Sequence, residues 1–182
     1  RRIFAESWER ANDQSWIYAG KGMGADIAAW KQGARAELAA LADWSTGYAQ
    51  ALLDLVKAFD RVPYWLLVRE AIELGFPLWM LRLSLAIYRM PRVIRIGSCY
   101  SKLVVAVRGI TAGSGLATTE MRRCMLRNIR RAMEAFPSVV PTLFVDDVSA
   151  ECTAPNEVVV ARLGGFIEHV AKQIKEYGMG LN

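Results

Sequence analysis

Apolar residues recur along the chain with helical spacing in some segments and with strand-like runs in others. Helices are predicted over residues 24–42, 60–74, 78–89, 116–135 and 155–177. Strands are predicted over residues 48–55, 139–145 and 147–151, and a β-hairpin over residues 91–109, turning at Gly97-Ser98. The order is strand, two helices, hairpin, helix, hairpin, helix. It indicates an α+β fold with an antiparallel sheet and helices packed on one face.

Acidic residues interrupt this apolar pattern at two places. Asp54 breaks a run that reads as a buried strand, and Asp146-Asp147 lie where a hairpin is expected to make a two-residue turn. A solvated turn would explain the pair but not Asp54. If the two strands are neighbours, Asp54 and Asp146 converge at one end of the sheet, where a hard divalent cation such as Mg²⁺ would relieve their repulsion. Two such ions about 4 Å apart support in-line phosphoryl transfer.

The 182 residues are enough for one domain with a sizeable core, and 53% of them are hydrophobic. The net charge of +5 is uneven: residues 61–136 carry 13 Lys and Arg but 4 Asp and Glu, a local +9, whereas the remainder is at −4. A basic block of this kind favours a polyanionic partner. For the arginines of residues 120–131, a solvated helix face is the competing interpretation.

Composition excludes several other classes of site. Three widely spaced cysteines, an odd number, argue against a disulfide framework, and the single histidine, His169, is too little for a His-based zinc site. No apolar run is long enough to span a membrane, and no signal peptide is visible. We therefore expect an intracellular protein, nuclear or cytoplasmic, with no membrane partner.

Four segments, taken in order and with their spacing, resemble the palm of a reverse transcriptase. They are "LLDLVKAFDRV" (52–62), "RGITAGSGLAT" (108–118), "LFVDDVSA" (143–150) and "YGMGLN" (177–182). The resemblance is greatest to the enzymes of non-LTR (LINE-like) retrotransposons, which are related to those of group II introns. Their first motif, Asp-x-x-Lys-Ala-Phe-Asp, is matched from Asp54 to Asp60.

The resemblance implies an RNA-directed DNA polymerase that uses two Mg²⁺ ions, for which Mn²⁺ can substitute. Asp54, Asp146 and Asp147 would be the catalytic acids, and together with the backbone carbonyl of Leu55 they would be the metal ligands. The implied partners are an RNA template, a DNA primer and a dNTP. Asp60 is expected to cap the helix that follows the first motif.

The resemblance also implies substrate-binding residues, with one clear departure from the family. Phe59 occupies the position of a steric gate against the 2′-hydroxyl of a ribonucleotide. In the loop that begins at Arg108, Gly113 would keep a close backbone approach that a Cβ would block. Ala112 stands where the family has Gln. Either a variant enzyme works without that amide, or this copy is a degenerate, non-catalytic nucleic-acid-binding remnant.

The resemblance divides the chain into a partial fingers region, residues 1–47, and a palm, residues 48–182, that stops before the thumb. We expect a piece of a longer polyprotein, with its fingers, thumb and possibly an endonuclease elsewhere, and little activity in isolation. An RNA-templated RNA polymerase would favour a small or polar residue at Phe59, and a nucleotide cyclase would need a different turn from the one at Asp146-Asp147. A plain structural α+β domain leaves Asp54 unexplained.

Overall fold

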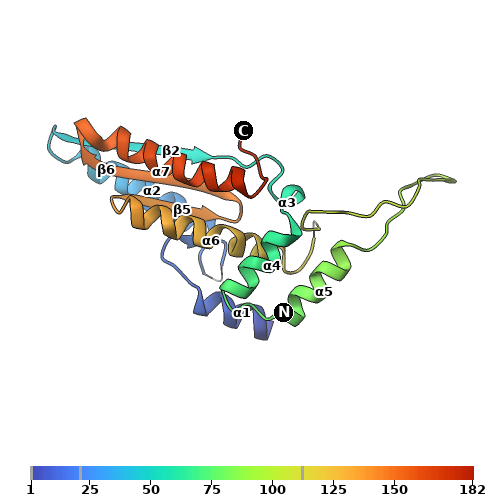
Figure 1. The fold of residues 1–182 in the computed structure, drawn as a ribbon. Helices are drawn as coiled ribbons and strands as arrows, with labels where there is room; N and C mark the ends of the chain where they lie inside the picture. Colours follow the sequence, from blue (N-terminus) through green and yellow to red (C-terminus); the bar gives the residue numbers. More distant parts are fainter. Residues whose placement is uncertain (1, 21, 112) are drawn as a thin grey trace.

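The computed structural model describes residues 2–20, 22–111 and 113–182, and its centre is a four-stranded sheet (Figure 1). The strand order is β1-β5-β6-β2. The strands are β1 (Ile17–Tyr18), β2 (Thr46–Leu53), β5 (Val139–Phe144) and β6 (Asp147–Pro155). β5 and β6 form an antiparallel hairpin, β2 pairs antiparallel with β6, and β1 pairs parallel with β5.

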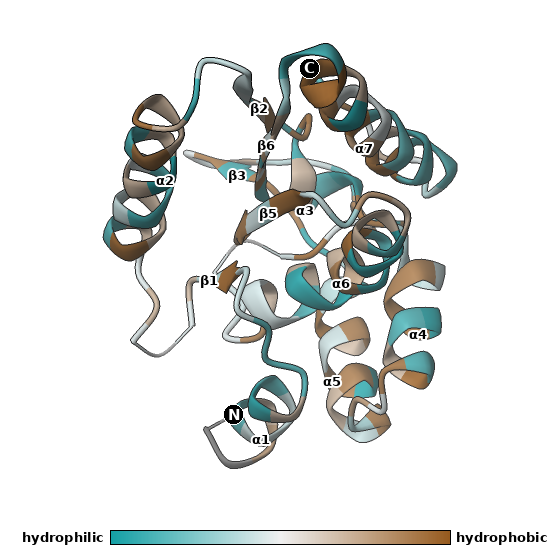
Figure 2. Cartoon of the chain, turned by 90° about the vertical axis from the view of Figure 1, so that its left-hand side faces the viewer, coloured by the Kyte–Doolittle hydropathy of each residue, from teal (hydrophilic) through white to brown (hydrophobic). Residues whose placement is uncertain are grey.

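Helices cover both faces of this sheet (Figure 2). α6 (Ala117–Ala135) and α7 (Asn156–Glu176) pack on one face, whereas α2 (Ala25–Ala40) lies across the other. Side chains of β6 alternate between the two: Val148 and Ala150 are fully buried in the core, and Ser149 accepts a hydrogen bond from Gln32 of α2. α6 and α7 therefore share one face, as predicted, and α2 closes the other.

Four further helices complete the described part of the fold: α1 (Arg2–Ala11), α3 (Ala58–Arg61), α4 (Tyr64–Glu73) and α5 (Leu78–Tyr88). α4 packs between α5 and α6. Most helices and strands form where the apolar pattern predicted them, with boundaries shifted by a few residues, except over residues 60–74 and 91–109; α1 and β1 are additions that the pattern did not predict.

The helix predicted over residues 60–74 is divided, and Asp60 does not cap it. Lys57, in the left-handed region at φ 48°, precedes the short helix α3, and Asp60 lies inside that helix. Val62 is extended at ψ 117° because the following Pro63 disfavours the α conformation, and α4 begins after that proline.

The hairpin predicted over residues 91–109 is paired mainly near its tip. β3 (Arg95–Ile96) and β4 (Cys99–Tyr100) flank Gly97, whose φ of 61° suits the turn, and a single further bridge joins Arg92 to Val104. The segment leaves the body of the molecule, as Figure 1 shows, so it has no core against which longer strands could pack.

The prediction of a solvated basic face on α6 is wrong for two of its arginines. Arg122 and Arg123 are 4% and 0% exposed. α6 is enclosed by the sheet, α7 and α4, which leaves little of its surface to water. The guanidinium of Arg123 lies 4.3 Å from the ring centroid of Phe76, and burial lowers its pKa.

The three cysteines are free thiols, of which Cys99 is exposed and Cys124 and Cys152 are buried. Burial raises the pKa of the Cys124 thiol to about 12, so it is inert at neutral pH. Across the described residues, no helix combines the length and the apolar character needed to cross a membrane.

Candidate functional site

The strand register brings the three predicted acids to one end of the sheet. Leu53, the last residue of β2, pairs with Val148 of the neighbouring strand β6. Asp54 therefore follows β2 beside Asp147, the first residue of β6, and Asp146 lies in the turn before it. Contrary to expectation, Asp54 does not lie within a buried strand: it is exposed and comes directly after the strand ends.

The turn between β5 and β6 differs from the predicted Asp-Asp turn. Phe144 pairs with Asp147, so the two turn residues are Val145 and Asp146. Val145 adopts φ 61°, in the left-handed region that Gly and Asn favour and that is strained for a β-branched side chain. The pairing of β5 with β6, which runs up to the turn, holds this conformation and fixes the direction of the adjacent acids.

The electrostatics of Asp146 reflect the proximity of the other two acids. Burial raises the pKa of its carboxyl, a hydrogen bond from its own backbone lowers it, and the negative charges of Asp147 and Asp54 raise it further. A bound divalent cation would reverse this repulsion, because it favours the ionised form of every nearby carboxyl.

Asp54 is held by the carboxy-terminal segment, a contact that the sequence did not predict. The side-chain amide of Asn182 donates to Asp54 Oδ2 at 2.5 Å, and the Asn182 backbone N–H donates to the Asp54 carbonyl at 3.0 Å. Leu55 forms a bridge with Leu181, and the Val56 N–H donates to the Gly180 carbonyl at 2.9 Å. The motif at residues 177–182 thus lies alongside the first motif.

The donor set suits Mg²⁺ in its chemistry, since carboxylate and carbonyl oxygens are the ligands that this ion takes. Within the described parts of the chain, however, no three His, Cys, Asp or Glu side chains are grouped so as to hold a metal ion. Asp54 instead bonds to Asn182. The structure gathers the acids at one end of the strands without arranging them as a coordination sphere.

Phe59 and the loop that begins at Arg108 are joined by backbone hydrogen bonds. Phe59 is half-buried in α3, and its carbonyl accepts the N–H of Ile110 at 2.8 Å. The N–H of Gly109 donates to the Val62 carbonyl at 2.8 Å. A Cβ at Gly109 would lie 2.9 Å from the Asp60 carbonyl oxygen, and its φ is 97°, so this position requires glycine. Exposed Arg108 completes the contact by pairing with Pro63.

Gly113 adopts φ 79°, which favours glycine, and among the described residues beyond its chain neighbours no atom lies within 4 Å of the place that a Cβ would take. Its expected close approach to a nucleotide or template stays a prediction. A tight backbone approach within the chain is found at Gly109. Ala112, the residue at the position of the family Gln, lies outside the described residues.

A buried polar network contacts the loop that begins at Arg108. The Tyr88 hydroxyl of α5 donates to Glu120 Oε2 of α6 at 2.5 Å and lies 2.9 Å from Ser114 Oγ in the loop. Burial raises the pKa of Glu120, and Arg123 opposes this shift. Sequence reasoning missed this network, because its members are distributed over three elements and only the fold brings them together.

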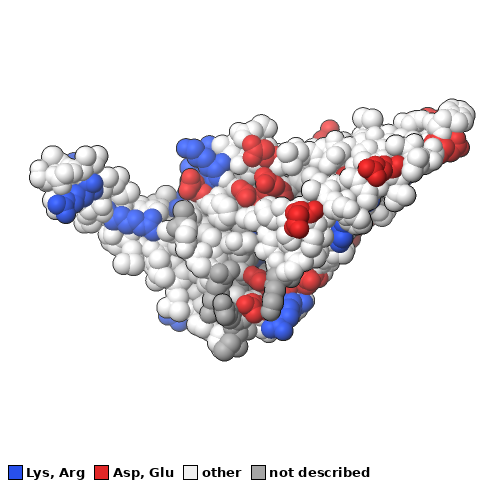
Figure 3. All heavy atoms as spheres, turned by 180° about the vertical axis from the view of Figure 1, so that it is seen from behind, with Lys and Arg blue, Asp and Glu red and all other residues white. Residues whose placement is uncertain are grey.

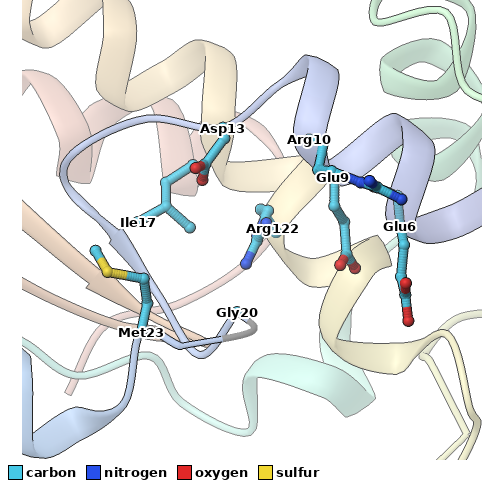
Figure 4. A pocket seen from close by; sticks show the side chains of 8 residues that line it. All are labelled: Glu6, Glu9, Arg10, Asp13, Ile17, Gly20, Met23 and Arg122. Atoms are coloured by element: carbon cyan, nitrogen blue, oxygen red, sulfur yellow. The ribbon is translucent and has the colours of Figure 1, made fainter. Parts of the chain in front are cut away.

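A separate cavity of about 260 Å³ lies between α1, the β1 region and α6 (Figure 4). Arg122 points into it toward Gly20, and a Cβ on Gly20 would lie 3.2 Å from Arg122 Nη2. Acidic side chains from α1 and the following turn line the cavity as well: Glu6, Glu9 and Asp13. None of the predicted site residues lies there.

Comparison with known proteins finds similarity in structure but not in sequence. No protein-family model matches the chain, and neither does any curated protein. An apo telomerase from Candida tropicalis, truncated from its C-terminal domain, is similar in structure over 100% of this chain, with a TM-score of 0.70 and 13% identity. The chain spans 38% of that protein. The likeness shows the fold, and the predicted α+β polymerase-palm fold is confirmed.

Proposed function

We propose that this chain is the palm-containing part of an RNA-directed DNA polymerase, a reverse transcriptase of the non-LTR retrotransposon and group II intron type. The observation that carries the proposal is the register of β2 on β6. It brings Asp54, the first acid of one motif, beside Asp147 and next to Asp146 of another, although more than 90 residues separate them. The palm-like fold, shared with a telomerase, is consistent with this assignment.

In the proposed reaction, a primer 3′-hydroxyl attacks the α-phosphorus of a dNTP paired with an RNA template. Asp54, Asp146 and the Leu55 carbonyl would bind two Mg²⁺ ions, with Asp147 as a supporting acid. These ions supply activation of the hydroxyl and stabilisation of the leaving pyrophosphate when bound. The Asn182 amide bonds to Asp54 Oδ2, so Asp54 Oδ1 is the oxygen that would bind an ion while this hydrogen bond is kept.

The remaining predicted residues would act on the nucleotide. Phe59 would exclude the 2′-hydroxyl of a ribonucleotide, because a ring rejects an added oxygen by sterics alone. Arg108, Ala112 and Gly113 would line the nucleotide and template side. Fingers, thumb and possibly an endonuclease would come from the rest of the parent polyprotein, so primer extension is expected from the parent and not from this chain alone.

The decisive experiment is Mn²⁺ binding by titration calorimetry with a dNTP present. We expect the wild-type chain to bind and Asp54→Asn to bind at least tenfold more weakly, because one ligand of the shared ion is lost. Asp43→Asn is the matched control, since this exposed acid precedes β2 and thus lies at the opposite end of the same strand. Equal binding by wild type and Asp54→Asn, or none by either, would contradict the proposal.

A non-catalytic nucleic-acid-binding remnant is the second candidate. It is favoured by Ala112 at the family Gln position and by the lack, within the described residues, of three acids grouped for a metal. This function predicts RNA or DNA binding that weakens steeply with salt, is unchanged by Mg²⁺ and survives Asp146→Ala. The polymerase proposal predicts that Mg²⁺ and Asp146 matter when a dNTP and a primer–template are both bound.

A further inference from the structure

Residues 89–108, here called the arm, extend from the body of the molecule between α5 and the loop of the candidate site (Figure 1). Every arm residue is exposed except half-buried Ala106. Few backbone hydrogen bonds stabilise it, and the paired strands β3 and β4 are two residues each. A long exposed segment of this kind offers its side chains to a partner.

The arm is strongly basic. It carries five cations and no acid, and Figure 3 shows Lys and Arg atoms on it while acids gather elsewhere on the same face. The cations are Arg89, Arg92, Arg95, Lys102 and Arg108. Because no carboxylate within the arm neutralises them, they favour a partner of high negative charge density.

The arm also exposes many large apolar side chains. Large apolar side chains lie between the cations, and at the tip Ile96 and Tyr100 are 79% and 65% exposed. The Arg95 guanidinium lies 5.6 Å from the Tyr100 ring centroid. Apolar wedges and aromatic rings flanked by cations are the groups with which proteins contact base steps and sugars while neutralising phosphates.

Both ends of the arm are fixed to the candidate site. Arg92 Nη2 donates to Thr111 Oγ1 at 2.8 Å, in the loop between Gly109 and Gly113. Arg108 pairs with Pro63, directly after α3, the helix that carries Phe59. Both ends of the arm thus contact the segments that carry the predicted substrate-binding residues.

We propose that the arm binds the double-stranded part of a nucleic acid held at the candidate site, an RNA–DNA hybrid. The cations contact its phosphates, and Ile96 and Tyr100 pack on its groove. This partner accounts for the basic charge and the apolar tip together. The proposal rests on the proposed function for the identity of the duplex, but the arm's contact with nucleic acid is tested independently of catalysis.

Cys99 provides a native reporter at the tip of the arm. It is the exposed thiol, whereas Cys124 and Cys152 are buried and should not react in the folded chain. We expect a 20-base-pair RNA–DNA hybrid to slow the reaction of Cys99 with a thiol reagent at least fivefold, and a dNTP alone to have no effect. Hybrid that binds by fluorescence anisotropy but leaves Cys99 fully reactive would overturn the proposal.

The salt dependence of binding tests the cations. Arg95→Gln with Lys102→Gln removes two predicted phosphate contacts, so the slope of log affinity against log salt should fall by about 2. Lys172→Gln with Lys175→Gln is the matched control, because these exposed lysines lie on α7 and its slope should equal that of wild type. Equal slopes for both double variants would overturn the proposal, as would no binding of hybrid by the wild-type chain.

Other occupants of the arm give different results. If a second copy covered the arm, Cys99 would be protected without nucleic acid, and the protection would increase with protein concentration. If the arm bound a lipid surface, anionic vesicles would protect Cys99 as well as the hybrid does. Either result overturns the proposal. If the wild-type chain and Asp54→Asn bind Mn²⁺ equally while the hybrid still protects Cys99, the polymerase function alone is rejected. The two failures are therefore distinguishable.

Discussion

Val145 is the residue whose backbone conformation is hardest to reconcile with its side chain. It adopts φ 61° in the turn that presents Asp146, and the left-handed region costs a β-branched residue roughly 1–2 kcal/mol. Asn tolerates this region better than a β-branched residue does. The strain is thus a local property of the acidic turn, where strain often accompanies function.

We therefore expect Val145→Asn to stabilise the fold by about 1 kcal/mol, which raises the melting temperature by about 2–4 °C for a chain of this size. Thermal denaturation followed by circular dichroism measures the change. Val140→Asn on the regular strand β5 is the control and should lower stability, because Asn is unfavourable in a strand without positive φ. A melting temperature that falls equally in both variants would show that the turn is not strained.

Asp146 provides a second test at the residue scale. Burial raises the pKa of its carboxyl, and so do the charges of Asp147 and Asp54, so its ionisation weakens the fold as pH rises from the unfolded pKa through the folded one. Asp54→Asn removes one of these charges and should lower the pKa of Asp146 toward its ordinary value. Carbon-13 NMR titration of the carboxyl measures it, and an unchanged or higher pKa would mean that the two acids do not interact.

Some site residues could be found from sequence because they conflict with their surroundings. Asp54 in an apolar run is one such conflict, and it led to the correct neighbouring strand. The roles of Gly109 and Gly113 could not be separated in this way, because both are glycines with positive φ and only the packing on Asp60 tells them apart. The burial of Arg122 and Arg123 also escaped, since helical spacing does not say how many elements surround a helix.

At the scale of elements, α2 is joined to the sheet by a polar contact and not by apolar packing alone. Arg35 makes a bidentate ion pair with Glu151 of β6, at 2.8 and 3.0 Å, and the Glu151 side chain is almost fully buried. The same pair raises the pKa of Arg35. The predicted fingers segment is thereby connected to the predicted palm through one charged contact.

Arg35→Ala should cost about 2 kcal/mol, because it leaves the buried Glu151 acceptor unsatisfied. The partial exposure of Arg35 keeps this cost below that of breaking a fully buried pair. The double change Arg35→Met with Glu151→Leu should recover most of that loss, since the unpaired charge is gone. Urea denaturation measures both. Arg162→Ala, at an exposed position on α7, is the control and should be nearly neutral. A double variant as unstable as Arg35→Ala would mean that the pair is needed for its attraction and not only to satisfy Glu151.

Element boundaries were predicted well where apolar spacing was strong, and less well where a local rule competed. α6 and α7 form as expected because their apolar faces are long and regular. The predicted helix over residues 60–74 is broken instead, because Pro63 forces Val62 out of the helical region. The long predicted hairpin shrinks to β3 and β4, since alternation alone cannot stabilise strands that pack on no core.

At the scale of the whole molecule, the α+β class could be predicted from element order, and the palm from the resemblance that the four motifs carry. The strand order β1-β5-β6-β2 could not, because β1 has only two residues and contributes no recognisable pattern. Nor could the position of the arm relative to the acids, which depends on contacts between α3 and the loop that begins at Arg108. These long-range contacts are what convert four separate motifs into one candidate site.

The fold predicts a wide range of local stability, which hydrogen exchange can measure. Arm amides have few hydrogen bonds and no buried cover, so we expect them to exchange at close to the rate of an unfolded chain, within about tenfold. Amides of β6 lie between two paired strands, over a core that includes fully buried Val148 and Ala150, and should open only with global unfolding.

Adding the RNA–DNA hybrid should slow exchange along the arm while leaving the exposed loop at residues 42–45 unchanged, since that loop precedes β2 and lies at its far end from the acids. A free chain whose arm is already as protected as β6 would contradict this prediction, because it would mean that another copy covers the arm before nucleic acid binds. Protection that spreads to the whole sheet would instead indicate global stabilisation by the ligand, without a specific contact at the arm.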